Sequence, residues 1–150
     1  MSIDRNLLDP YVVSVLEKSG WNENRKIDIS SWKAVLVDEG YSIFSYAEEI
    51  LENFGGIEIN DKDDRIYSCP QFDFDPVNAA SGEFDRLEYY QSIAHDQLFP
   101  IGSIVDGIAY VGISKKFYWG SVDKLYLVGN SIERYLNNLF SWRKSSQLLN

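Results

Sequence analysis

The sequence is short of the residues from which most metal sites and covalent frameworks are built. It contains one cysteine, one histidine and one methionine among 150 residues. The single cysteine, Cys69, excludes an internal disulfide framework and any zinc site made of several cysteines. We expect Cys69 to be a small buried hydrophobic residue, because cysteines outside disulfides are among the most buried residue types.

Long hydrophobic segments are lacking too. No apolar run approaches the roughly 20 residues that a transmembrane helix needs. The first nine residues carry Asp4, Arg5 and Asp9 and have no long apolar stretch, so they do not resemble a signal peptide. We therefore expect a cytoplasmic protein that has no membrane partner.

Positive charge is also scarce. Lysine and arginine number 14 against 23 aspartates and glutamates, which gives a net charge of −9 and argues against nucleic acid as a direct partner. The segment Glu48–Glu88 alone carries twelve acidic and three basic residues, and twelve minus three accounts for the whole net charge. The other residues carry eleven of each sign, so the chain is a neutral domain with one acidic middle segment.

This acidic segment has two interpretations. It is either a solvated surface that aids solubility or an electrostatic face that speeds association with a cationic protein. Outside it, Tyr118 and Trp119 form either the aromatic edge of a strand or an exposed anchor for a partner, because both residue types are enriched at binding hot spots. The candidate partner-binding residues are Asp61, Asp63, Asp64, Asp73, Asp75, Glu83, Asp85, Tyr118 and Trp119.

Motifs for catalysis are absent as well. No G-x-S-x-G elbow occurs, and Gly55-Gly56 lacks the Lys-Ser/Thr of a phosphate-binding loop. Nothing around Cys69 resembles a reactive cysteine that could pair with His95. Asp73, Asp75 and His95 could bind a divalent cation in principle, but two alternating aspartates on an extended segment suit a salt bridge equally well. We expect no enzyme, no catalytic residues, no metal and no cofactor.

The sequence does contain a clear pattern of helices. Hydrophobic residues make up 45% and aromatic residues 15% of the chain, which is enough for a core. Ser45 with Glu48 has the spacing of a capping box, and Asn130 with Glu133 is a second candidate pair of capping residues. Phe84 falls on the apolar side of the fourth helix. The expected helices cover residues 9–20, 30–40, 45–54, 83–95 and a final stretch from 131 onward.

Strands are expected mainly in the second half. Asp106-Gly107 is a strong two-residue hairpin signal. Residues 70–80 are expected to be irregular. The fold class is therefore α+β, with N-terminal helices, an antiparallel sheet of about five to six strands and a C-terminal docking helix. We expect a single domain over residues 1–150 with its core at about 11–142. The expected strands cover residues 57–60, 65–69, 101–105, 108–113, 117–119 and 125–128.

A spaced set of motifs also runs through nearly the whole chain. It comprises Gly20-Trp21, Arg25, Gly40-Tyr41, Phe54-Gly55-Gly56, Phe72–Pro76, Phe99–Gly102 and Val128–Ile132. In this order and spacing, the set resembles the third SUKH subfamily of bacterial immunity proteins over roughly residues 11–140. The chain departs from the pattern at Ser114-Lys115-Lys116, where the family commonly has an Asp-x-x-Gly turn before a strand.

The resemblance implies an α+β fold without catalysis and a role in neutralising a toxin delivered by related competing bacteria. Such toxins are often nucleases, so the implied partner is a cognate toxin with a cationic surface. We expect Trp21, Arg25, Gly55 and Gly56 to be structural, with Arg25 near a carboxylate such as Asp73. Two alternatives stay open: a regulatory interaction module without a toxin, and a small metal-dependent hydrolase built on the aspartates and histidine named above.

Overall fold

The computed structural model describes residues 1–60, 69–142 and 146–150. A short 3-10 helix, η1 (Arg5–Leu7), comes first. The α-helices that follow are α1 (Pro10–Lys18), α2 (Ser30–Asp38), α3 (Ser45–Phe54), α4 (Pro76–Ala80), α5 (Asp85–Ala94) and α6 (Ile132–Leu139). The strands are β1 (Glu58–Ile59), β2 (Phe72–Asp73), β3 (Leu98–Ile104), β4 (Gly107–Gly112), β5 (Phe117–Ser121), β6 (Lys124–Gly129) and β7 (Gln147–Leu148).

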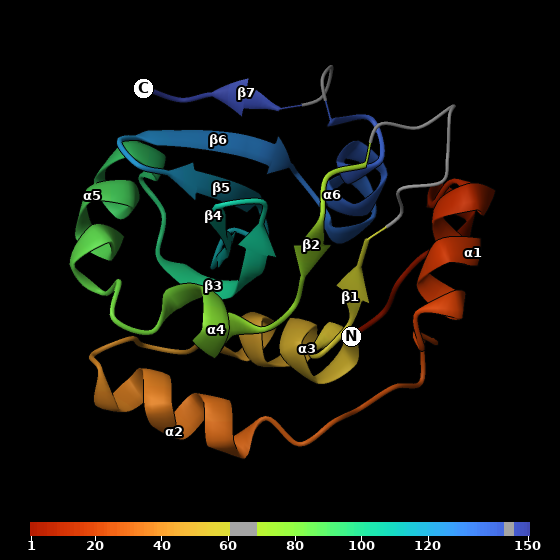
Figure 1. Ribbon diagram of the computed structural model, residues 1–150, viewed down its shortest axis with the longest axis horizontal. Coiled ribbons are helices and arrows are strands. Elements are labelled where there is room, and N and C mark those ends of the chain that lie inside the picture. The colour runs from red at the N-terminus through yellow and green to blue at the C-terminus, as the bar shows by residue number, and fades with distance from the viewer. Residues whose placement is uncertain (61–68, 143–145) are drawn as a thin grey trace.

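The strands form one antiparallel sheet whose spatial order is the sequence order, β1 to β7. Figure 1 shows α2 and α3 below the sheet, α5 on the left and α1 and α6 on the right. The predicted α+β class is confirmed. The described residues contain seven strands rather than five or six, because β1, β2 and β7 have two residues each and are too short to produce an alternating pattern.

Helices pack on both faces of the central strands. On one face, the rings of Phe117 in β5 and Tyr135 in α6 stack with centroids 4.7 Å apart. Tyr110 in β4 is offset by one residue from the position that pairs with Phe117, and its ring packs edge-on against Tyr90 of α5 at 5.6 Å. Successive strand residues point to opposite faces, so α6 and α5 cover opposite sides of the sheet. All six residues of β4 are buried in consequence.

The main core lies on the α6 side and is largely aromatic. Phe74 stacks on Phe54 of α3 at 5.1 Å and meets Tyr135 edge-on at 6.5 Å. Phe72 of β2 packs edge-on against Phe140, which caps the end of α6, at 6.1 Å. All of these rings are almost fully buried, and large rings of this kind dominate the energetics of a core.

Two predicted helix caps are wrong. Ser45 is already the first residue of α3, whose N-cap is Phe44 and has no capping side chain, and Glu48 instead pairs with Lys33 of α2 at 3.3 Å. At α6 the cap is Ser131, whose hydroxyl accepts a hydrogen bond from the backbone of Arg134 at 3.1 Å, and not Asn130. In both cases the prediction misplaced the start of the helix by a single residue.

Segment 70–80, which was expected to be irregular, carries β2 and α4. Asp75 caps α4 by accepting a hydrogen bond from the backbone of Asn78 at 3.0 Å, and Pro76 occupies the first helical position. The strand predicted at 65–69 lies mostly outside the described residues, and β1 pairs with β2 instead. Phe72 in turn pairs with Ile104 of β3, so this segment joins the short outer strands to the central sheet.

The turns of the meander also differ in detail from the expectation. Ile104 pairs with Gly107, so the two residues of the hairpin turn are Val105 and Asp106 rather than Asp106-Gly107. At the position where the family pattern has a glycine-containing turn, Lys115 adopts a positive φ of 72°. Its ammonium group lies over the ring of Tyr46 at 5.1 Å, which holds this left-handed residue against α3.

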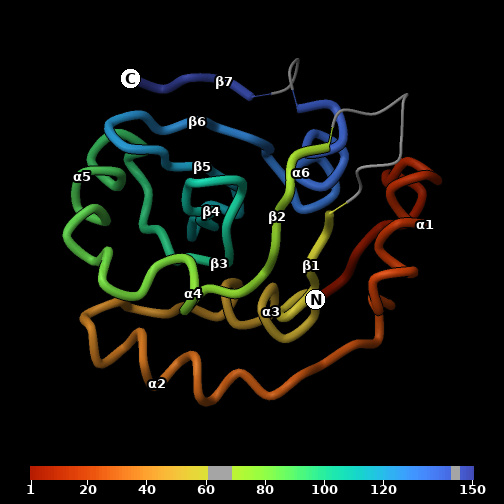
Figure 2. Tube along the Cα trace, viewed as in Figure 1, coloured from red at the N-terminus to blue at the C-terminus, as the bar shows by residue number. Residues whose placement is uncertain are grey.

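The end of the described chain returns to the sheet, and Figure 2 shows β7 lying along the outer side of β6. Leu149 donates a backbone hydrogen bond to Leu125 at 2.8 Å, and the Asn150 side chain accepts one from the Leu125 backbone at 2.9 Å. The last residues therefore satisfy part of the outer edge of β6.

Candidate functional site

The loop after α1 is attached to α3 by one buried asparagine. The Trp21 side chain is 2% exposed and stacks on Phe54 at 5.7 Å with nearly parallel rings. Its indole N–H donates a hydrogen bond to the Asn53 side-chain oxygen at 2.8 Å. The Asn53 amide in turn donates to the carbonyls of Glu23 and Arg25 at 3.1 and 3.0 Å. The polar atoms of this buried side chain are thus satisfied.

Arg25 completes this junction from the other side. Its guanidinium donates to the Asn53 carbonyl at 2.9 Å, and the Ile27 backbone donates to the Glu52 carbonyl at the same distance. These carbonyls belong to the last turn of α3, which would otherwise lack partners. Partial burial lowers the pKa of Arg25. The positive charge sits at the negative end of the helix dipole, which is a favourable position.

The expected contact of Arg25 with Asp73 or Asp75 is not seen among the described side chains. The Asp73 carboxylate accepts hydrogen bonds from the Ser103 hydroxyl at 2.7 Å and from the backbone of Asp75 at 3.0 Å. Both aspartates therefore serve local backbone structure around β2 and α4. The alternation of Asp73 and Asp75 along the chain therefore comes from their hydrogen bonds to the backbone of turns and not from a salt bridge.

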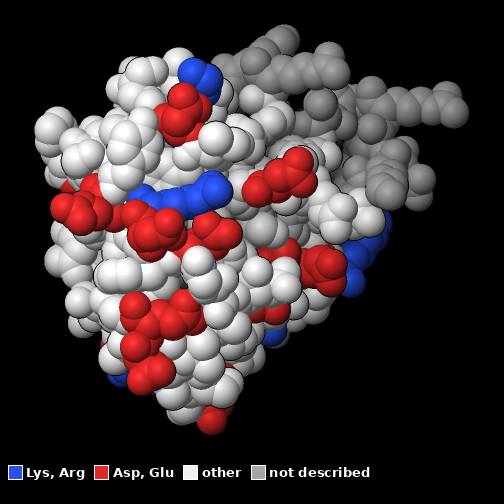
Figure 3. Space-filling model, turned by 60° about the vertical axis from the view of Figure 1, so that its left-hand side comes forward, with Lys and Arg blue, Asp and Glu red and all other residues white. Residues whose placement is uncertain are grey.

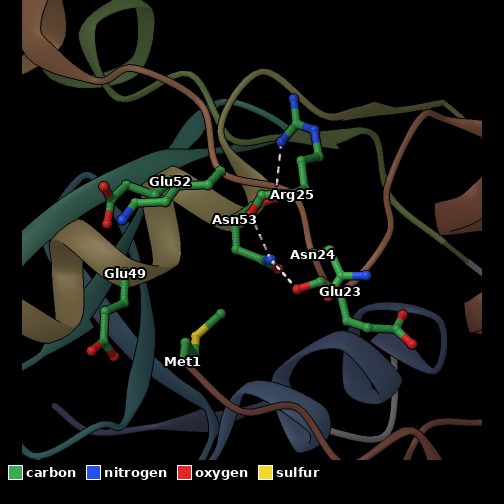
Figure 4. Close-up of a pocket in the computed structure, with 8 residues that line it drawn as sticks. Met1, Glu23, Asn24, Arg25, Glu49, Glu52 and Asn53 are labelled. Carbon is green, nitrogen blue, oxygen red and sulfur yellow. Dashed lines mark hydrogen bonds between the residues drawn. The ribbon is translucent and has the colours of Figure 1, made fainter.

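The hollow in Figure 4 is formed by this same junction. The close-up shows Asn53 at its centre, with dashed hydrogen bonds to Arg25 and Glu23, and Glu49, Glu52 and Met1 around the rim. The Glu23 carboxylate is already paired with the guanidinium of Arg5 at 2.6 Å, which lowers the Glu23 pKa. We interpret this hollow as a structural junction, because its central polar groups are bonded to one another.

The described acids of the acidic segment are divided among several elements of the fold. Asp61, Asp63 and Asp64 lie outside the described residues. Glu48, Glu49 and Glu52 are on α3, Asp73 and Asp75 flank the start of α4, and Glu83, Asp85 and Glu88 are at α5. Of the described candidates, only those at α5 stand beside exposed aromatic side chains.

The side of the molecule formed by α5 is the most distinctive described surface. The turn between β5 and β6 is attached to α5, because the Tyr89 and Tyr90 hydroxyls donate to the carbonyls of Asp123 and Val122, each at 2.8 Å. We define the α5 surface as Glu83, Phe84, Asp85, Arg86, Glu88, Tyr89, Val122, Asp123 and Lys124. Figure 3 brings this side of the molecule forward and shows many acidic and few basic side chains on it.

The α5 surface also exposes apolar groups. The Phe84, Tyr89 and Val122 residues are 39%, 45% and 72% exposed. The sequence prediction placed Phe84 on the buried side of the helix, but Phe84 precedes α5 as its N-cap residue. The sequence reasoning did not single out Tyr89, and the Tyr89-Tyr90 pair gave no decisive signal, because consecutive helical residues are about 100° apart and can both be buried, as Tyr135 and Leu136 of α6 are.

Tyr118 is not an exposed anchor. It is 3% exposed in β5, and its hydroxyl donates to the Asp96 carboxylate at 2.8 Å. Burial and the Asp96 carboxylate raise the Tyr118 pKa. Trp119 is half-buried, with its indole N–H donating to the Ile104 carbonyl at 2.9 Å and its ring packed edge-on against Trp142. Neither ring stands out from the surface as a partner anchor would.

One buried hydroxyl beneath α5 has no hydrogen-bond partner among the described residues, that of Tyr110. By contrast, the buried Tyr41 hydroxyl donates to the Ala80 carbonyl at 3.0 Å. We expect Tyr110→Phe to change the free energy of unfolding by less than about 0.5 kcal/mol or to raise it, and Tyr41→Phe to lower it by about 1–2 kcal/mol, since only the second leaves a partner unpaired. Urea unfolding of both variants tests this, and an equal loss in the two would show that the Tyr110 hydroxyl is bonded.

The described residues offer little for chemistry. Among them, no group of three or more histidine, cysteine, aspartate or glutamate side chains is arranged to hold a metal ion. His95 ends α5 in a left-handed conformation with φ 53°, and the Cys69 thiol donates to the Pro70 carbonyl at 3.3 Å. In the same ranges, no helix is both long and apolar enough to cross a membrane.

Comparison with known proteins gives one match. The family model described as SUKH-3 immunity protein matches residues 8–141, which include the Trp21–Asn53 junction, strands β1 to β6 and α6. Neither the curated proteins nor the solved structures give a significant match. Because the family model covers most of the chain and its whole central fold, the chain belongs to the SUKH-3 immunity protein family.

Proposed function

We propose that the protein protects its host by binding a cognate toxin in a stoichiometric complex, and that this toxin is a nuclease with a cationic surface. The family match over residues 8–141 carries this proposal. The net charge of −9 supports it, because a nuclease needs basic groups to bind phosphate, and an acidic protein is attracted to such groups.

Inhibition of the toxin by binding alone, without catalysis, also agrees with the described structure. The Asp73 and Asp75 carboxylates are engaged in hydrogen bonds to turns, and His95 ends α5 through its left-handed backbone. Binding needs only a complementary surface, and complexes of nuclease toxins with their immunity proteins are among the tightest known.

A titration of toxin activity tests the proposal. The cognate toxin domain, which is to be sought first among the neighbouring genes, is assayed at fixed concentration, well above the dissociation constant, while the protein is added in steps. We expect activity to fall linearly and to vanish near one protein per toxin. Complete inhibition at a small fraction of that ratio would indicate turnover and contradict stoichiometric binding, and the absence of any inhibition would contradict the immunity function against this toxin.

The same assay tests whether Cys69 and His95 take part in catalysis or in metal binding. We expect Cys69→Ser and His95→Asn to inhibit with the same end point as the wild type. Asparagine is chosen because it tolerates the left-handed conformation of His95. A folded variant that no longer inhibits would restore the case for an enzyme or a metal site.

A further inference from the structure

Resting on the proposed function, we propose that the α5 surface is the toxin-binding face, with Phe84, Tyr89 and Val122 as apolar anchors alongside its carboxylates, and that its partner is a protein surface rich in lysine and arginine. Exposed apolar groups with a polar rim are typical of interaction sites. On this chain the two features coincide at α5.

The carboxylates of the α5 surface are available to a partner. Arg86 is paired with Glu83 at 2.9 Å, whereas no basic side chain among the described residues forms a salt bridge with Asp85, Glu88 or Asp123. In total the surface carries four acidic and two basic residues. Unpaired acidic side chains attract a cationic protein. Because salt screens this attraction, the rate of encounter should fall as the salt concentration increases.

The apolar anchors are held in place by the fold. The Phe84 ring meets Tyr41 edge-on at 5.0 Å and lies so close to Gly40 that a Cβ there would be 2.8 Å from the ring. The Tyr89 hydroxyl is bonded to the Asp123 carbonyl and accepts a hydrogen bond from Asn150 at 3.3 Å. Side chains that are already ordered lose less entropy on binding, which favours tight association.

A buried polar group lies under the same helix. The ring of Tyr110 packs on Tyr90 of α5, and its hydroxyl has no hydrogen-bond partner in the described chain. Buried polar groups are usually paired. Tyr110 is fully buried and does not reach a partner, so the assignment of the α5 surface rests on its unpaired carboxylates and exposed rings.

The acids of α3 and β1 provide a matched comparison. Glu49 and Glu58 belong to the same acidic segment and likewise form no salt bridge with the described residues, but Figure 1 places their elements away from α5. A double reversal at either place changes the net charge of the protein equally. Any difference between the two variants therefore reports the position of the interface and not the total charge.

The test measures binding of the cognate toxin domain, which is to be sought first among the neighbouring genes. We expect Asp85→Lys/Glu88→Lys to weaken the affinity at least about 100-fold, because like charges would face each other, and Glu49→Lys/Glu58→Lys to stay within about threefold of the wild type. Circular dichroism confirms that each variant is folded. If the α5 reversal binds within threefold of the wild type, or the control loses as much, the α5 assignment is wrong while the proposed function stands.

Two further variants keep the proposal testable should the reversed protein fail to fold. Asp85→Asn/Glu88→Gln preserves shape, and we expect it to slow association several-fold at low salt and to flatten the dependence of the rate on salt. Phe84→Ala/Tyr89→Ala should speed dissociation by tenfold or more. Unchanged kinetics in both would overturn the α5 assignment, and a wild-type protein that does not bind the toxin would overturn the proposed function as well.

Discussion

Trp21→Ala is expected to lower the free energy of unfolding by about 3–5 kcal/mol, the range found when a large buried aromatic side chain is truncated. The loss has two sources. The indole leaves a cavity against Phe54, on which it stacks, and the Asn53 side-chain oxygen loses the donor that satisfies it. Because Asn53 also holds the carbonyls of Glu23 and Arg25, the effect should extend to the loop after α1.

Urea unfolding followed by circular dichroism measures this change. Leu7→Ala is the control, because that side chain is exposed and its removal should cost less than about 0.5 kcal/mol. Trp21→Phe separates the two sources, since it keeps a ring against Phe54 but removes the N–H donor. A folded Trp21→Ala protein that loses under about 1 kcal/mol would contradict the structural role of Trp21 and return it to the candidate binding residues.

Periodic elements could be predicted from the sequence because their signals are local. The final helix, α6, shows its apolar stripe at helical spacing, and the hairpins of β3 to β6 have apolar runs separated by turn residues. The start of α3 could not be fixed in this way. Ser45 has the composition of a cap, yet Phe44 occupies that position, and Glu48 pairs with Lys33 on another helix.

The candidate site depends on contacts that are distant along the chain. Acidic residues at 48–88 are close together in sequence, but the fold distributes the described ones over α3, β1, the β2–α4 segment and α5. The α5 surface in turn takes Val122 and Asp123 from the β5–β6 turn, which is attached through Tyr89 and Tyr90. Charge counting could therefore indicate that an acidic face exists, but not which residues compose it.

Substitution in the structural motif Gly55-Gly56 is expected to cause the second large loss of stability. Its two glycines are required for different reasons. Gly55 has an ordinary φ of −51°, but a Cβ there would collide with the Leu51 carbonyl and lie 2.6 Å from the Trp32 ring. Gly56 has open space around it, with Arg25 at 3.8 Å, but a φ of 81°. The first glycine is thus needed for close packing and the second for its left-handed backbone.

We therefore expect Gly55→Ala to lower the free energy of unfolding by about 3 kcal/mol or more, at the upper end for overpacking, because a backbone oxygen cannot move aside as a side chain can. Gly82→Ala is the matched control: it has a φ of 82° and nothing within 4 Å, so its cost should be only the left-handed strain of about 1–2 kcal/mol. At Gly56, asparagine should be tolerated better than alanine. Thermal and urea unfolding of the four variants measure the order. Equal losses for Gly55→Ala and Gly82→Ala would mean that α3 can shift away from Trp32, and that close packing at Gly55 does not fix the junction with the loop after α1.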